Sequence, residues 1–191
     1  MSFSSSAWCL AMIFYRAASP GVATLAAKLL YFFPIAAPSA FLLFGLFYSS
    51  KKVNKLLVSV IISTAFLIAI VTLIKGAVIV EVIPSATGEK HIIFGWAYYS
   101  LYLLYYPMVF GFAYILFLTK SLAAARTKKA QLFSLLIGMG ATSTLAMVTN
   151  LFLPTLGNFQ FNWVGQVCVF FWISSTYLAI QKYHLLDIRR L

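Results

Sequence analysis

Residues 130–181, AQLFSLLIGMGATSTLAMVTNLFLPTLGNFQFNWVGQVCVFFWISSTYLAIQ, contain no charged side chain. This uncharged stretch is much longer than the about 20 apolar residues that one membrane-spanning helix needs. It is interrupted at 154–158 by PTLGN, and proline and glycine together are typical of a turn between helices. The sequence therefore predicts two membrane-spanning helices, at 131–153 and 160–181.

The rest of the chain repeats this pattern of long apolar runs. Uncharged runs predict three further spans, at 29–48, 56–74 and 94–119. A shorter run at 3–18 predicts an incomplete helix, because even a helix from Met1 to Ala18 would reach only about 27 Å while the hydrocarbon core is about 30 Å thick. The predicted fold is an all-α, polytopic transmembrane bundle of about six helices, with a membrane-embedded domain at 1–181.

The composition excludes other classes of protein. The chain has 191 residues, of which 63% are hydrophobic and only 9% charged, whereas soluble domains carry about 25% charged residues. A soluble globule, a disordered tail and a disulfide-stabilised secreted module are therefore excluded. Cys9 and Cys168 stand alone in apolar runs, which favours simple packing over redox or zinc chemistry.

Basic residues predict the orientation of the helices. Ten of the 14 basic residues fall on one side of the predicted spans: Lys51, Lys52, Lys55, Lys120, Arg126, Lys128, Lys129, Lys182, Arg189 and Arg190. Since cytoplasmic loops are enriched in Lys and Arg, this side and the C-terminus are predicted to be cytoplasmic, in the inner (plasma) membrane. On the other side, residues 77–83 are rich in β-branched side chains. They predict either a short outer β-hairpin or a continuation of the preceding helix past Lys75.

The predicted spans lack the groups that most membrane chemistry requires. No Asp, Glu, Lys or Arg lies inside a full span, which argues against a proton-coupled carrier, a pump and a voltage-gated channel. No nucleotide-binding, zinc-protease or serine-hydrolase motif occurs, and His91 and His184 fall on opposite sides. We therefore expect no catalytic, cofactor-binding or metal-binding residue, no enzymatic activity in this chain and no nucleic-acid partner.

Two sets of residues are candidates for helix packing or for an outer pocket. A stripe of small and polar residues recurs at four-residue steps: Ser134, Gly138, Thr142, Ala146 and Asn150. Such a stripe favours close static packing of helices over a sliding contact. Asn150 and Gln166 must face protein or water, because an unpaired amide in hydrocarbon is costly. With Asn158, Gln160 and Asn162 they are candidates for the rim of an outer pocket, although a hydrogen bond between helices is the simpler role.

Aromatic side chains dominate the span at 94–119. Trp96, Tyr98 and Tyr99 fit the belt of aromatic residues at a membrane surface. Tyr102, Tyr105 and Tyr106 lie deeper and are expected to face the bundle, because their hydroxyls need partners. Plain packing is favoured, and an aromatic cavity for a small hydrophobic ligand is the alternative.

The C-terminal sequence carries a resemblance to a known family. The last span runs into AIQKYHLLDI at 179–188. It resembles the exit segment "A-I-x-[KR]-Y-x-L-[LF]-D-I" that closes the N-terminal seven-helix membrane region of bacterial sensor histidine kinases. The matching positions are Ala179, Ile180, Lys182, Tyr183, Leu185, Leu186, Asp187 and Ile188. Residues 7–8, 19–20 and 28–31 are similar to that family's second helix and the start of its third, so the chain corresponds to the region without its first helix.

The resemblance implies a function and partners. It implies a signal-input module whose residues 182–191 form a cytoplasmic exit helix, leading to a kinase or other output domain that this chain does not contain. It also implies a homodimer in the full-length context and signalling by displacement of the last helix. The alternative is a small membrane protein that binds or transports an uncharged or hydrophobic solute.

Overall fold

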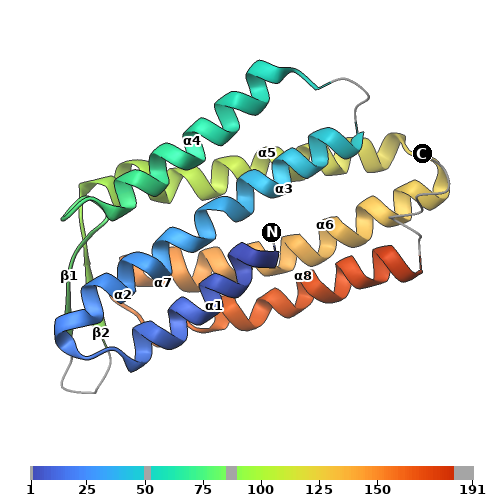
Figure 1. The fold of residues 1–191 in the computed structure, drawn as a ribbon. Coiled ribbons are helices and arrows are strands. Elements are labelled where there is room, and N and C mark those ends of the chain that lie inside the picture. Colours follow the sequence, from blue (N-terminus) through green and yellow to red (C-terminus); the bar gives the residue numbers. More distant parts are fainter. Residues whose placement is uncertain (1, 50–52, 85–89, 183–191) are drawn as a thin grey trace.

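The computed structural model describes residues 2–49, 53–84 and 90–182, and these form a bundle of helices with one small β-hairpin (Figure 1). Five helices of this part of the chain are long and apolar enough to cross a membrane, so the prediction of a membrane helix bundle is confirmed in outline. They cover Pro20–Tyr48, Lys55–Leu73, Tyr98–Ala123, Arg126–Thr155 and Val164–Gln181. A sixth helix, α1 (Ser2–Ala17), has 16 residues and is about 24 Å long at 1.5 Å per residue.

Three of the spans are built from several helical segments. The first combines α2 (Pro20–Phe32), a 3₁₀ turn η1 (Phe33–Ile35) and α3 (Ala36–Ser49). After α4 (Lys55–Leu73), a π-helical segment η2 (Tyr98–Tyr102) leads into α5 (Leu103–Ala123). The fourth span joins α6 (Arg126–Met147), a second π-helical segment η3 (Val148–Phe152) and α7 (Leu153–Thr155), and α8 (Val164–Gln181) forms the last span.

The first span begins earlier than predicted. The sequence predicts 29–48, but the helix already begins at Pro20 and includes Lys28. Its 29 residues give a length of about 44 Å, which exceeds the about 30 Å hydrocarbon core. The Lys28 ammonium donates to the carbonyl of Leu73 at 2.9 Å, in the last turn of α4. A lysine near a helix boundary can reach the interface in this way, so it did not mark the start of the helix.

Of the two alternatives for residues 77–83, the hairpin is correct. The helix α4 ends at Leu73, and Gly76 then adopts a left-handed conformation with φ of 77°. The antiparallel strands β1 (Ile79–Pro84) and β2 (Lys90–Phe94) follow. Phe94, the predicted first residue of a span, therefore lies in a strand instead. A Cβ at Gly95 would overlap backbone atoms of Gly76 and Ala77, so only glycine allows this close return of the chain.

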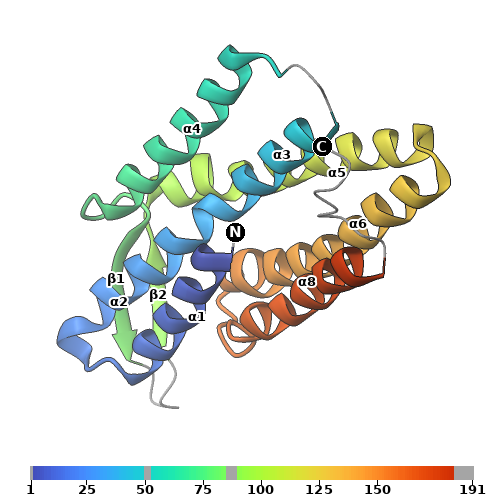
Figure 2. The same ribbon diagram turned by 45° about the vertical axis from the view of Figure 1, so that its right-hand side comes forward.

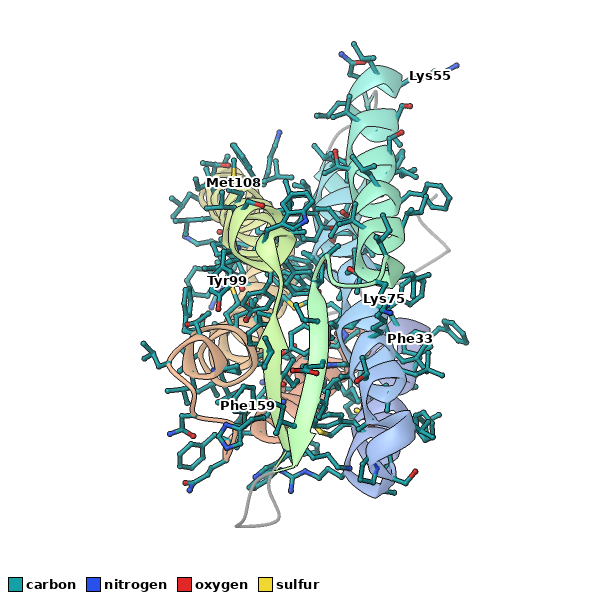
Figure 3. The ribbon with its side chains drawn as sticks, turned by 90° about the vertical axis from the view of Figure 1, so that its left-hand side faces the viewer. Phe33, Lys55, Lys75, Tyr99, Met108 and Phe159 are labelled. Carbon is teal, nitrogen blue, oxygen red and sulfur yellow. The ribbon has the colours of Figure 1, made fainter. Side chains whose placement is uncertain are left out.

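The two ends of the bundle differ. We call the end that carries β1, β2 and the loop 156–163 the hairpin end, and the other the basic end, where α3, α5 and α8 finish (Figures 1 and 2). Seen from the hairpin end, the two strands cross the end of the bundle between α2 and α5 (Figure 3). The helix α1 runs from the hairpin end to about halfway along the bundle (Figures 1 and 2).

The stripe of small and polar residues forms the contact between α6 and α8. A Cβ at Gly138 would overlap the Ser175 side chain, and Ser134 donates to the Ser175 carbonyl at 3.1 Å. Thr142 lies within hydrogen-bond distance of the Cys168 carbonyl, at 2.8 Å. The last described turn of α8 ends at Lys182, whose N–H donates to the Leu178 carbonyl at 2.9 Å.

Candidate functional site: a cavity inside the bundle

A cavity lies in the hairpin-end half of the bundle, and helices from far-apart parts of the sequence form its wall. Its volume is about 70 Å³. It is lined by Ser4, Ser5 and Trp8 of α1, by Leu30, Tyr31, Pro34 and Ala37 of the first span, by Tyr102, Tyr106 and Phe110 of the third, by Met139, Thr142, Ser143, Ala146, Met147, Asn150 and Leu151 of the fourth, and by Val169 and Trp172 of α8. No charged residue is among these lining residues.

Tyrosine hydroxyls bind backbone carbonyls that irregular helix geometry leaves free. Pro34 has no N–H, so it cannot donate to the Tyr31 carbonyl across the 3₁₀ turn. The Tyr102 hydroxyl donates to this carbonyl instead, at 2.6 Å. Tyr102 also contacts the Tyr106 hydroxyl at 3.0 Å, one helical turn further along. All three tyrosine rings are buried.

Tyrosine hydroxyls also bind backbone carbonyls on the opposite wall, around the π-helical segment η3. Pro154 lacks the N–H that would bind the Asn150 carbonyl four residues earlier. The Tyr31 hydroxyl donates to that carbonyl at 3.3 Å, and the Tyr98 hydroxyl donates to the Leu151 carbonyl at 2.9 Å. Short π-helical segments occur often at functional sites, and the two found among the described residues, η2 and η3, both contribute residues to the cavity.

The smaller hydroxyls of the wall also use their hydrogens on backbone carbonyls. Ser143 donates to the Met139 carbonyl at 2.7 Å, and Ser4 donates to the Phe33 carbonyl at 2.5 Å. Thr142 lies 2.9 Å from the Gly138 carbonyl and 2.8 Å from the Cys168 carbonyl. Each hydroxyl has one hydrogen and two lone pairs, so each keeps an acceptor function.

Two amide side chains lie at the hairpin end of the last two spans, and one of them, Gln166, binds α1. We orient the Gln166 amide so that its nitrogen donates to the carbonyls of Trp163 and Asn162, both at 2.9 Å, and its oxygen accepts from Trp8 Nε1 at 3.2 Å. The Asn150 amide nitrogen donates to the Thr149 hydroxyl at 2.9 Å. The Asn150 side-chain oxygen lies 3.5 Å from the Gln166 amide group.

A lysine of the hairpin holds α1 in place beside the cavity. Lys90 Nζ donates to the carbonyls of Tyr15, Arg16 and Ala18 at 2.5, 2.8 and 2.8 Å, which satisfies the C-terminal end of α1. It also lies 5.4 Å from the centre of the Tyr15 ring. Burial, with a smaller contribution from the charge of Arg16, lowers the pKa of the Lys90 ammonium from its usual value.

Several of the predicted packing or pocket residues line this cavity: Tyr102, Tyr106, Thr142, Ala146 and Asn150. Gly138 lies at the contact with α8, and Gln166 lies behind Asn150. Asn158, Gln160 and Asn162 belong to the loop after α7, and they are not among the lining residues. Of the predicted exit segment, Tyr183, Leu185, Leu186, Asp187 and Ile188 lie outside the described residues, and Lys182 is the last residue described.

One aromatic prediction is wrong, and several lining residues were missed. Trp96 and Tyr99 are 68% and 51% exposed, as interfacial side chains are, but Tyr98 is 0% exposed and packs in the core. Sequence reasoning missed Ser4, Ser5, Trp8 and Ser143 because nothing in their local sequence indicates which helix they face. The stripe at four-residue steps indicated Thr142 and Asn150, and the cost of an unpaired amide in hydrocarbon was a second signal for Asn150.

The surroundings limit what this site can do chemically. Within the described residues, no three His, Cys, Asp or Glu side chains lie close enough to hold a metal ion. A second hollow of about 510 Å³ lies between α3, α4 and α5, and its lining is apolar apart from Ser39, Thr64, Tyr105 and Thr119. The smaller cavity therefore brings together more polar groups and is the better candidate for a specific site.

Comparison with known proteins adds no assignment. No family model matches the sequence, no curated protein matches it, and no solved structure matches it. Function is accordingly inferred from the geometry of the cavity and from the C-terminal sequence.

Proposed function

We propose that this chain is the signal-input module of a membrane sensor, in which occupancy of the cavity is coupled to the last helix. The single observation that carries the proposal is that Val169 and Trp172 of α8 form part of the cavity wall. The same helix leads directly towards the exit segment that resembles sensor histidine kinases. A small molecule in the cavity therefore contacts the element that leaves the membrane.

The packing around α8 supports a mechanical link. Gly138 and Ser175 touch closely on the side of α6, so α8 cannot approach α6 further without a steric overlap. Trp172 packs edge-on against Phe41 of α3, with ring centres 5.9 Å apart. A change in the cavity that displaces Trp172 is then expected to shift or rotate α8, and a continuous helix transmits such a motion beyond the membrane surface.

The extent of the cavity favours a sensor over a solute facilitator. Its lining residues on α5 end at Phe110 and those on α6 end at Met139, so the basic-end halves of both helices contribute nothing to the wall. A facilitator needs a path that reaches both ends of the bundle. Reconstituted vesicles should therefore show no uptake of small uncharged solutes above that of protein-free vesicles, and rapid selective uptake would favour the facilitator.

The proposal includes an orientation and an assembly. The basic end, with Lys55, Lys120 and Arg126, faces the cytoplasm of the cell that carries the chain in its inner membrane, since basic loops favour that side. The output domain is a kinase or a related signalling domain, and the full-length protein is a homodimer. Each of these statements follows from the resemblance or from the basic residues.

A chimera tests the function. The chain is joined after Leu191 to the cytoplasmic core of a histidine kinase, and one to four residues are inserted after Asp187. Autophosphorylation should vary with insert length at the helical period of about 3.6 residues. The same inserts in the turn between Ala123 and Arg126 serve as a control and should produce no such period. A smooth dependence on length at the first site would contradict coupling through a rotating helix.

A further inference from the structure

We infer that the cavity binds a small neutral molecule through a hydroxyl group that donates a hydrogen bond, with a short-chain aliphatic alcohol as the ligand class. The inference deepens the proposed function by naming what the sensor would bind. It rests on that proposal for its biological role, but the binding itself is argued from the hydrogen bonds of the wall.

The positions of the hydrogens can be counted along the tyrosine chain. Tyr102 has one hydroxyl hydrogen, which goes to the Tyr31 carbonyl at 2.6 Å, the shorter of its two contacts. At the 3.0 Å contact between the two hydroxyls, Tyr106 must then be the donor. The Tyr106 oxygen thus has no hydrogen left and offers only lone pairs to a ligand.

Three smaller hydroxyl groups of the wall also have no hydrogen left for a ligand. The hydrogens of Ser4, Thr142 and Ser143 all go to backbone carbonyls, at distances of 2.5 to 2.9 Å. A ligand that only accepts hydrogen bonds, such as an ether or a ketone, would bring its lone pairs against the lone pairs of these groups and leave these acceptors unpaired.

An alcohol oxygen also fits the groups that still have a hydrogen to offer. Ser5 lines the cavity, and its hydroxyl makes no hydrogen bond with the described residues. Trp172 also lines the cavity, and its indole N–H likewise makes no hydrogen bond with the described residues. A hydroxyl group both donates and accepts, so one alcohol oxygen can pair with an acceptor of α5 or α6 and with one of these donors. An ether oxygen has no hydrogen, so it can pair only with the donors and not with the acceptors.

Charge and size narrow the ligand further. No acidic side chain is among the lining residues, so an ammonium ion would be desolvated without a counter-charge. The volume of about 70 Å³ holds about five water-sized particles at roughly 15 Å³ each. Leu30, Phe110 and Val169 provide apolar surface for the remainder of the ligand. These limits describe a molecule the size of butanol.

The test uses the full chain in lipid nanodiscs and the photoreactive alcohol 3-azibutanol. After illumination, mass spectrometry should find label on residues of the cavity wall, for example on the peptides that contain Tyr106 and Thr142. Competition then compares two isomers of equal size, 1-butanol, which donates a hydrogen bond, and diethyl ether, which does not. We expect 1-butanol to suppress the labelling at concentrations at least tenfold lower than diethyl ether.

Variants provide a second test. The substitution Ser143→Ala removes one acceptor from the wall and should weaken the protection given by 1-butanol several-fold. Tyr114→Phe is the matched control, since its hydroxyl contacts the Met139 carbonyl at 3.4 Å and it is not a lining residue; it should change nothing. The competition in the unmodified chain needs no variant, so a variant that fails to fold leaves the inference testable.

The outcomes separate this inference from the proposed function. Equal competition by the two isomers, or label confined to lipid-facing positions such as Met108, would overturn the inference. The labelling experiment measures ligand binding and needs no output domain. The chimera measures coupling between the last helix and the kinase and needs no ligand. Selective labelling with a period-free chimera would therefore retain the site and refute the sensor, and the reverse result would retain the sensor and refute the site.

Discussion

Replacing Tyr102 by phenylalanine should destabilise the bundle more than the same change at Tyr106. Loss of the Tyr102 hydroxyl removes two contacts at once, the donor to the Tyr31 carbonyl at 2.6 Å and the acceptor for Tyr106 at 3.0 Å. The carbonyl then loses its tyrosine donor in the core, and Pro34 has no N–H to replace that donor. Loss of the Tyr106 hydroxyl removes only one contact, and no carbonyl loses its donor.

The magnitudes follow from hydrogen bonds measured in other membrane proteins, which contribute about 0.6 kcal/mol on average and at most about 1.7 kcal/mol. Two contacts give an expected loss of about 1–3 kcal/mol for Tyr102→Phe, and one contact gives about 0.6 kcal/mol for Tyr106→Phe. The double variant should fall short of the sum by the shared contact, about 0.6 kcal/mol. Tyr177→Phe, on a side chain that is 61% exposed, is the control and should change stability by less than about 0.5 kcal/mol.

The assay is reversible unfolding of the purified chain in mixed micelles, with increasing sodium dodecyl sulfate and the helical circular dichroism signal as the readout. The single and double variants form a thermodynamic cycle with the unmodified chain. If Tyr106→Phe costs as much as Tyr102→Phe, the assumed direction of the hydrogen bonds is wrong. If the two changes add fully, the contact between the two hydroxyls contributes nothing to stability, and the assignment of Tyr106 as its donor has no support. The cavity would then no longer be a wall of acceptors.

Three further predictions concern other parts of the bundle. Gly138→Ala should destabilise the chain by about 1–3 kcal/mol in the same unfolding assay, because its Cβ overlaps α8, while Gly140→Ala, with open space around it, should be neutral or stabilising by up to about 1 kcal/mol. Lys90→Met should increase hydrogen exchange at the end of α1 at least several-fold, because three carbonyls lose their donor, whereas Lys75→Met should have no effect there. A cysteine at Ala124, in a chain without its two native cysteines, should react with impermeant reagents only from the cytoplasmic side of intact cells; reaction from outside would reverse the proposed orientation.

The sequence predicts the spans well because lipid leaves few alternatives. Every backbone polar group in hydrocarbon needs a partner within the segment, so a long uncharged run has to be helical. The turn after the fourth span was also predictable, because it needs a left-handed conformation, with φ of 78°, that glycine favours and Gly157 provides. The start of the first span was not, because Lys28 finds its partner at the end of α4, more than 40 positions away in the chain.

The site was partly predictable for a different reason. A stripe at four-residue steps is a local property of one helix, so Gly138 and Thr142 could be assigned to a common face before any partner was known. Which side chains meet that face depends on the mutual rotation of helices, and no local pattern encodes this rotation. Trp8 was missed for this reason, although its indole binds the Gln166 amide on a helix more than 150 positions later.

The irregular helix geometry and the polarity of the cavity have one physical cause. Prolines at 34 and 154 free the carbonyls of Tyr31 and Asn150, which in hydrocarbon must find other donors. Tyrosine hydroxyls from neighbouring helices supply these donors, and in doing so they use up the hydrogens that a ligand would otherwise receive. Removing a proline should therefore change which ligand the cavity prefers and not only the fold.

In Pro154→Ala the Asn150 carbonyl regains a helical N–H, so the Tyr31 hydroxyl no longer has to donate to it. The Tyr31 hydrogen then becomes available to a ligand in the cavity. Labelling by 3-azibutanol should then be suppressed by diethyl ether at concentrations closer to those of 1-butanol, and an unchanged ratio between the two isomers would contradict this link.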